Sequence, residues 1–176
     1  MLRILLFIGL SHAQSQKRLP DAIIFGVRKG GTRALLEFVE INSKVSAAGP
    51  EIHFFDRDAN YNQGFSWYRE QMPEATEDQL VIEKTPRYFV VKKAVERMQE
   101  LQRKRQEDCD RGFASKWTCK PLKLVLIVRE PVSRLISGYT QIQDKRLKLN
   151  KEPGPELEQE VFKNGDPAQG KGQITR

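Results

Sequence analysis

The sequence predicts an α/β fold in which helices flank a largely parallel sheet. After Pro20, short apolar runs alternate with segments whose apolar residues recur at helical spacing, the pattern of parallel strands joined by helices. A glycine-rich turn also joins the first apolar run to the first helix-like segment. The 176 residues, 39% of them hydrophobic, suffice for one domain with a core and are too few for two.

In chain order, the apolar residues 22–25 are predicted as a buried strand, followed by a turn at 26–31 and a helix at 32–41. Residues 44–55 contain a possible second strand and a loop. Residues 65–72 form a short aromatic helix that ends before Pro73.

The second half continues the alternation. Residues 80–83 are predicted as a strand that stops at Thr85 and Pro86, and a charged helix covers residues 92–108. Residues 122–128 form the most apolar run, which we interpret as another buried strand, and Pro131 suits the first turn of the next helix.

Both ends of the chain differ from this domain. Residues 1–13 have a basic start, an apolar run too short to span a bilayer and small residues before Gln14, so we expect a signal peptide cleaved after Ala13. A buried first strand is the alternative. Residues 148–176 are rich in proline and glycine and are expected to form a loop-rich or disordered tail.

Composition limits the partners. Thirty Lys and Arg against 23 Asp and Glu give a net charge of +7, which favours a polyanion such as nucleic acid, a membrane surface or sulfated polysaccharide. The basic cluster 103–105 is interpreted as a solvated helix face. Cys109 and Cys119 either pair in an oxidising compartment or remain free thiols. His12 and His53 stand apart, so no metal site is predicted.

The turn GVRKGGTR at residues 26–33 is the first candidate site. Adjacent glycines let backbone N–H groups approach an anion, the following helix adds a favourable dipole, and Lys29 adds charge. The spacing is not that of the ordinary P-loop. A plain strand-to-helix turn is the alternative interpretation.

Two further segments carry chemistry. Arg129 ends the predicted strand 122–128 and Ser137 lies on the next helix, where they would hold a second phosphate; the alternative is an Arg129 paired with Glu130 at the surface. In residues 51–56, alternation puts Glu51 and His53 on one side, where a carboxylate can accept a hydroxyl proton. Core packing with incidental polar neighbours is the alternative there.

Together these segments resemble the heparan sulfate glucosamine 3-O-sulfotransferases. The resemblance consists of four blocks in the family's order, at residues 20–37, 51–56, 82–86 and 127–139. It implies a P-loop-NTPase-like sulfotransferase fold, of which residues 19–147 would be a partial domain.

The resemblance also implies a donor, 3′-phosphoadenosine 5′-phosphosulfate, and an acceptor, the 3-hydroxyl of glucosamine in heparan sulfate, without nucleic acid and without a required metal. Glu51 matches the catalytic base, and Lys29 matches the lysine that stabilises the departing phosphate. The positions that match donor-binding residues are Lys29, Gly30, Gly31, Thr32, Arg33, Arg129 and Ser137. The positions that match residues of the acceptor cleft or its support are Arg28, His53, Asp56, Lys84, Gln141 and Lys145.

The expected location is the Golgi lumen or the outside of the cell, without a transmembrane span. Residues 98–120 are longer than is usual in the family, and the chain stops where relatives continue, so a truncated domain is expected. The alternatives are a catalytically silent glycan-binding relative and a P-loop nucleotide kinase, which the absent Walker spacing disfavours.

Overall fold

The structure, a computed structural model, describes residues 15–112, 117 and 119–162. Its main sheet has four parallel strands in the order β3-β5-β2-β6, which confirms the predicted α/β class. The predicted signal peptide lies outside the described residues. The strands are β2 (Ala22–Gly26), β3 (Val45–Ala47), β5 (Leu80–Lys84) and β6 (Lys123–Leu126).

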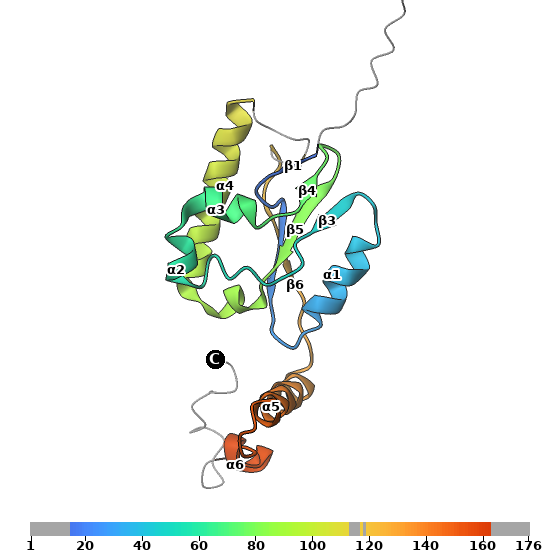
Figure 1. The fold of residues 1–176 in the computed structure, drawn as a ribbon, viewed down its shortest axis with the longest axis vertical. Helices are drawn as coiled ribbons and strands as arrows, with labels where there is room; N and C mark the ends of the chain where they lie inside the picture. Colours follow the sequence, from blue (N-terminus) through green and yellow to red (C-terminus); the bar gives the residue numbers. More distant parts are fainter. Residues whose placement is uncertain (1–14, 113–116, 118, 163–176) are drawn as a thin grey trace, which may run out of the picture.

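Helices cover both faces of this sheet (Figure 1). Helix α1 (Thr32–Glu40) lies on one face, and α3 (Gly64–Glu70) and α4 (Lys92–Asp110) lie on the other. Successive side chains of β2 serve the two faces in turn, since Ile24 packs in one cluster with Leu36 of α1 while Ile23 packs in another with Leu101 of α4. The hydrophobic core is therefore divided by the sheet into two layers.

Several short elements were not predicted. Strand β1 pairs antiparallel with β4 before the main sheet begins. The described part of the predicted tail contains one short helix, α6, and residues 163–176 lie outside the described residues. These elements are β1 (Gln16–Lys17), β4 (Glu74–Ala75), α2 (Asp58–Tyr61), η1 (Pro86–Val90) and α6 (Leu157–Val161).

The predicted burial of the strand within 122–128 is wrong. Strand β6 exists, but Leu124 and Leu126 are 49% and 42% exposed. Within the described residues β6 pairs only with β2 and forms an edge of the sheet, so part of its apolar surface remains uncovered. An apolar sequence shows that burial is favourable, but burial also needs a neighbour.

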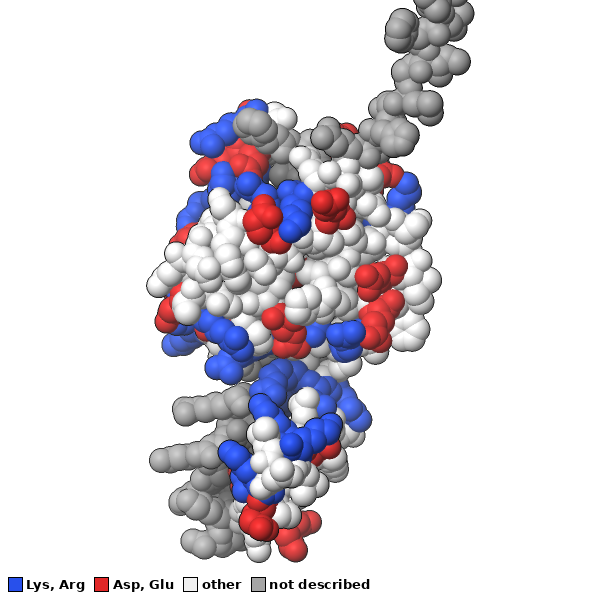
Figure 2. All heavy atoms as spheres, viewed as in Figure 1, with Lys and Arg blue, Asp and Glu red and all other residues white. Residues whose placement is uncertain are grey.

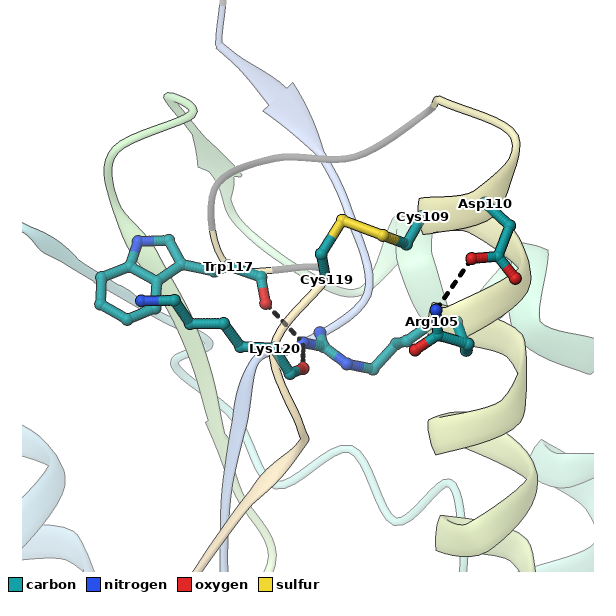
Figure 3. Close-up of a disulfide and its surroundings, with 7 residues drawn as sticks. Arg105, Cys109, Asp110, Trp117, Cys119 and Lys120 are labelled. Atoms are coloured by element: carbon teal, nitrogen blue, oxygen red, sulfur yellow. Dashed lines mark hydrogen bonds between the residues drawn. A yellow bond between two sulfur atoms is a disulfide. The ribbon is translucent and has the colours of Figure 1, made fainter.

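The interpretation of residues 103–105 as a solvated face is wrong for Arg105, which is 1% exposed. Its Nη1 donates to Asp21 Oδ1 at 2.8 Å and to the carbonyl of Pro20 at 2.7 Å. Its Nη2 donates to the carbonyls of Trp117 and Lys120 (Figure 3). Arg105 therefore fastens α4 to the segments that enter β2 and β6.

A disulfide joins Cys109, in the last turn of α4, to Cys119, so the two thiols are paired (Figure 3). The two residues are ten positions apart and their Cα atoms are separated by 5.2 Å. The bond closes a short loop directly beside the buried guanidinium of Arg105.

Replacing both cysteines by serine is expected to lower the free energy of unfolding by about 3 kcal/mol, because an open loop of this length regains conformational entropy in the unfolded chain. Urea denaturation followed by circular dichroism measures the change. The reduced wild-type protein is the matched control and should lose a similar amount. Equal unfolding midpoints for the oxidised wild type and the double variant would contradict the prediction.

Candidate functional site

A cleft of about 370 Å³ lies where the carboxyl ends of β2 and β5 meet α5 (Pro131–Lys148). Ligands of parallel α/β sheets gather at this edge, because the loops that follow the strands converge there. The cleft is strongly cationic and contains one carboxylate. Its lining residues are Arg28, Lys29, Gly31, Thr32, Arg33, Glu51, Lys84, Pro86, Arg129, Ser137 and Gln141.

The turn between β2 and α1 forms one wall of the cleft. Val27 N donates to Ile127 O at 2.9 Å, and Ile127 N donates to Gly26 O at 3.0 Å, so the turn is fastened to the segment after β6. Gly30 lies so close to this segment that an added Cβ would be 2.7 Å from Ile127 O. A residue without a side chain is required at this position.

Helix α1 begins in a way that suits an anion. Gly31 is the N-cap with φ 98°, a left-handed conformation that favours glycine. No side chain caps this end, and the first turn contains no acidic residue. The first N–H groups of α1 therefore retain capacity for an anionic ligand, and the helix dipole favours one.

The cleft's carboxylate belongs to Glu51, which follows β3 in a loop. Lys84 Nζ, at the end of β5, donates to Glu51 Oε1 at 2.6 Å, and His53 Nε2 lies 3.5 Å from Glu51 Oε2. The glutamate side chain is 38% exposed, whereas that of Lys84 is 5% exposed. Glu51 is thus held in place while part of its side chain remains accessible.

His53 and Asp56 lie behind Glu51. The Nδ1 atom of His53 is 3.0 Å from Asp56 Oδ2, which also contacts Arg87 Nε at 3.1 Å. A partly buried imidazole between two carboxylates keeps its orientation through both ring nitrogens. Glu51 and His53 share one side, as predicted, although His53 has φ 55° and the segment is a loop.

Helix α5 forms the opposite wall. Glu130 caps its first turn by accepting hydrogen bonds from Val132 N at 2.8 Å and Ser133 N at 2.7 Å. These backbone donors are the main cause of the lowered pKa of Glu130, and the charge of Arg129 adds to it. Arg129 lines the cleft immediately before this cap, as its position after β6 suggests.

Ser137 and Gln141 are one helical turn apart on α5, so both side chains reach the cleft. Lys145 lies one turn beyond Gln141 and is not among the lining residues. The last turn of α5 is basic, with Lys145, Arg146 and Lys148, and Figure 2 shows Lys and Arg side chains gathered over this helix. The helix therefore extends the positive surface beyond the cleft.

A second cavity of about 350 Å³ adjoins the first and shares Arg28, Lys29 and Arg129 with it. Apolar side chains, among them Phe89 and Leu135, line its remaining walls. Sequence reasoning did not include these apolar residues, since nothing in their local pattern distinguishes them from core residues. The first cavity is therefore mainly ionic and the second mainly apolar, and the three shared cations lie between them.

Sequence reasoning also missed Glu83 and Thr85, which are completely buried. Burial raises the pKa of Glu83 to about 7, although hydrogen bonds from Tyr68 and Thr85 favour its ionised form. The signals in the sequence were an acidic residue at the end of the apolar run 80–82 and the block 82–86 that resembles the family, neither of which indicates a role for these two side chains.

The described residues, which omit positions 1–14, 113–116, 118 and 163–176, contain no cluster of three or more His, Cys, Asp or Glu side chains that could hold a metal ion. None of their helices combines the length and apolar character that a membrane crossing requires.

A glycine-bearing turn, a helix N-terminus and a row of cations around one carboxylate give this α/β protein a cleft whose chemistry suits phosphate or sulfate groups. The comparison with protein families is more specific, because the model described as "Sulfotransferase domain" matches residues 19–168. The chain therefore belongs to the sulfotransferase domain family, in agreement with the fold predicted from its sequence.

Within this family, the chain is similar to several heparan sulfate glucosamine 3-O-sulfotransferases. The chain is 42% identical over 157 residues to heparan sulfate glucosamine 3-O-sulfotransferase 3A1 of Mus musculus, which covers 89% of this chain and 34% of that protein. It is 43% identical over 135 residues to heparan sulfate glucosamine 3-O-sulfotransferase 5 of Homo sapiens, covering 77% of this chain and 34% of the relative. The chain thus spans about a third of the length of these relatives.

Proposed function

We propose that this chain transfers a sulfuryl group from 3′-phosphoadenosine 5′-phosphosulfate to the 3-hydroxyl of a glucosamine unit in heparan sulfate. The observation that carries the proposal is the position of Glu51 in the same cleft as the turn that contains Lys29. Relatives named for this reaction share 39% to 43% of their aligned residues with the chain.

The reaction needs a base and a cation on opposite sides of the transferred group. The 3-hydroxyl oxygen attacks sulfur, its proton passes to the carboxylate of Glu51, and the bond from sulfur to the phosphate oxygen breaks. The departing 3′-phosphoadenosine 5′-phosphate keeps the electron pair of that bond, and the ammonium of Lys29 stabilises its new charge. Catalysis is then mostly positioning and charge stabilisation, as in phosphoryl transfer.

The donor would bind the turn and α5 together. Its 5′ end is assigned to Lys29, Gly30, Gly31, Thr32 and Arg33, where the N-terminus of α1 accepts an anion. Its 3′-phosphate is assigned to Arg129 and Ser137, because a guanidinium forms paired hydrogen bonds to phosphate and a hydroxyl adds another.

The acceptor is assigned to the rest of the cleft. Lys84 and His53 hold Glu51, while Arg28 and Gln141 line the surface on which a sulfated sugar would lie. Asp56 orients His53, and Lys145 would meet the polysaccharide beyond the cleft. A polyanionic acceptor also suits the net charge of +7, and the proposed location is the Golgi lumen or the extracellular space.

Incubating the purified chain with radiolabelled donor and heparan sulfate tests this function. We expect label to enter the polysaccharide, and disaccharide analysis to locate it on the 3-oxygen of glucosamine. Label on another oxygen or on nitrogen would contradict the acceptor assignment, and label retained entirely by the donor would contradict the enzymatic one.

A second function, glycan binding without transfer, is favoured by the cations that line the cleft and by the basic last turn of α5, since both attract a polyanion whether or not the donor is bound. Retention on heparin that is eluted by salt, combined with absence of transfer, would distinguish it.

A further inference from the structure

Glu83 is a completely buried acid that the proposed reaction does not use. Its neighbour Lys84 faces the cleft and contacts Glu51, whereas Glu83, one position earlier on β5, points to the opposite side of the strand. Tyr68 of α3 donates its hydroxyl proton to Glu83 Oε1 at 2.7 Å. A buried carboxyl group in this position needs a reason, since its desolvation is unfavourable.

The second carboxylate oxygen of Glu83 is connected, through Thr85, to the loop that contains Glu51. Thr85 Oγ1 donates to Glu83 Oε2 at 3.0 Å. The same hydroxyl oxygen accepts from the backbone N–H of Ile52 at 3.2 Å and from that of His53 at 3.5 Å. One buried hydroxyl thus connects the acid of β5 to the two residues that follow Glu51 in the chain.

The direction of these hydrogen bonds is important. A hydroxyl group has one proton and two acceptor lone pairs. Because the hydroxyl of Thr85 donates its hydrogen bond to Glu83, both lone pairs of the hydroxyl oxygen remain available to the N–H groups of the loop. Glu83 therefore fixes the orientation in which Thr85 can hold the loop.

Other contacts fasten the same loop. Tyr88 Oη accepts from Phe54 N at 3.0 Å, and Asn60 Nδ2 donates to the carbonyls of Ile52 at 2.9 Å and of His53 at 3.2 Å. Among the contacts described for this loop, Thr85 holds the N–H groups nearest to Glu51, so it acts directly on the backbone from which that carboxylate projects.

We propose that Thr85, oriented by Glu83, is a positioning residue that sets the place of the Glu51 carboxylate by holding the backbone of Ile52 and His53. This inference rests on the proposed function for its catalytic consequence. Small errors in the placement of a reacting group have large kinetic effects, so the hydroxyl of Thr85 should influence turnover without touching either substrate.

The test compares Thr85→Val, which keeps the size and removes the hydroxyl, with Thr85→Ser, which keeps the hydroxyl and removes a methyl group. Hydrogen exchange by mass spectrometry measures the exchange rates of the amides of residues 52–54, and steady-state kinetics measures kcat and KM for sulfate transfer. In Thr85→Val we expect exchange about tenfold faster at Ile52 and His53, with exchange in α1 unchanged. Its kcat should be about 10-fold to 100-fold lower, with the KM for the donor unchanged.

Thr85→Ser should resemble the wild type in both measurements, which a role in packing alone would not explain. If Thr85→Val fails to fold, Glu83→Gln replaces it, because a carboxamide has one acceptor oxygen for two hydroxyl donors. Unchanged exchange at Ile52 and His53 in the folded variant would overturn the inference, and so would faster exchange with wild-type turnover. Amide hydrogen exchange does not depend on sulfate transfer. An inactive wild type would therefore contradict the proposed function, while the exchange rates of Ile52 and His53 would still show whether Thr85 holds the loop.

Discussion

Replacing Glu51 with glutamine is expected to reduce kcat for sulfate transfer by roughly 100-fold to 10,000-fold, the usual contribution of a general base. The amide keeps the size of the side chain and its acceptor oxygen, so Lys84 still has a partner, but it cannot take the proton of the attacking hydroxyl. The loss should appear in kcat, because the donor is assigned to residues on the other side of the cleft.

Radiolabelled sulfate incorporation under saturating donor and acceptor measures this effect. Glu96→Gln is the matched control, since it makes the same chemical change at an exposed position on α4 and should leave turnover unaltered. Circular dichroism should give the same melting temperature for both variants within a few degrees. Wild-type turnover in Glu51→Gln would remove this residue from the mechanism.

The fold was predictable where local patterns decide the structure. The run before Gly26 is short, apolar and bounded by turn residues, and the structure confirms it as the strand β2, followed by helix α1. The burial of β6 was predicted wrongly, because burial depends on which elements cover a strand and the sequence of the strand does not contain that information.

The burial of Arg105 was also predicted wrongly, in this case for a charged residue that was expected to be exposed. Three basic residues in a row on a helix usually face water, but α4 turns Arg105 toward Asp21, which is 84 positions earlier in the chain. The formation of this buried ion pair follows from tertiary contacts that helical periodicity cannot show. The strands β1 and β4, each of two residues, are likewise too short to produce a pattern.

The sequence motifs predicted the residues that line the candidate site, but they did not predict the buried residues that hold those side chains in place. The turn with Lys29, the carboxylate of Glu51 and the arginine after β6 were named from the sequence, and the structure brings them to one cleft. Thr85 was interpreted as the end of a strand and as part of the block 82–86, without a role in the site, because its hydrogen bonds join segments 33 positions apart. Lys145 remains a prediction, since it lies outside the cleft and would contact only an extended acceptor.

Replacing Lys29 with alanine should reduce kcat by roughly 100-fold to 1,000-fold, the scale of losing one charge that stabilises a transition state. Lys29 has φ 64°, and alanine retains the same Cβ, so the substitution removes the ammonium without changing the strain of the turn. Charge on the departing phosphate develops as the bond to sulfur breaks, so this cation acts most strongly in the transition state and kcat should fall more than the donor KM rises.

Lys44→Ala is the matched control for Lys29→Ala, because Lys44 is an exposed lysine paired with Asp78, away from the cleft. Steady-state kinetics with varied donor separates the two parameters, and calorimetry with 3′-phosphoadenosine 5′-phosphate measures ground-state binding. A large loss of nucleotide affinity with unchanged kcat would show that Lys29 only holds the donor. A loss confined to kcat would show that the ammonium of Lys29 stabilises the departing phosphate in the transition state. In that case its interaction with the nucleotide becomes stronger only as the bond to sulfur breaks.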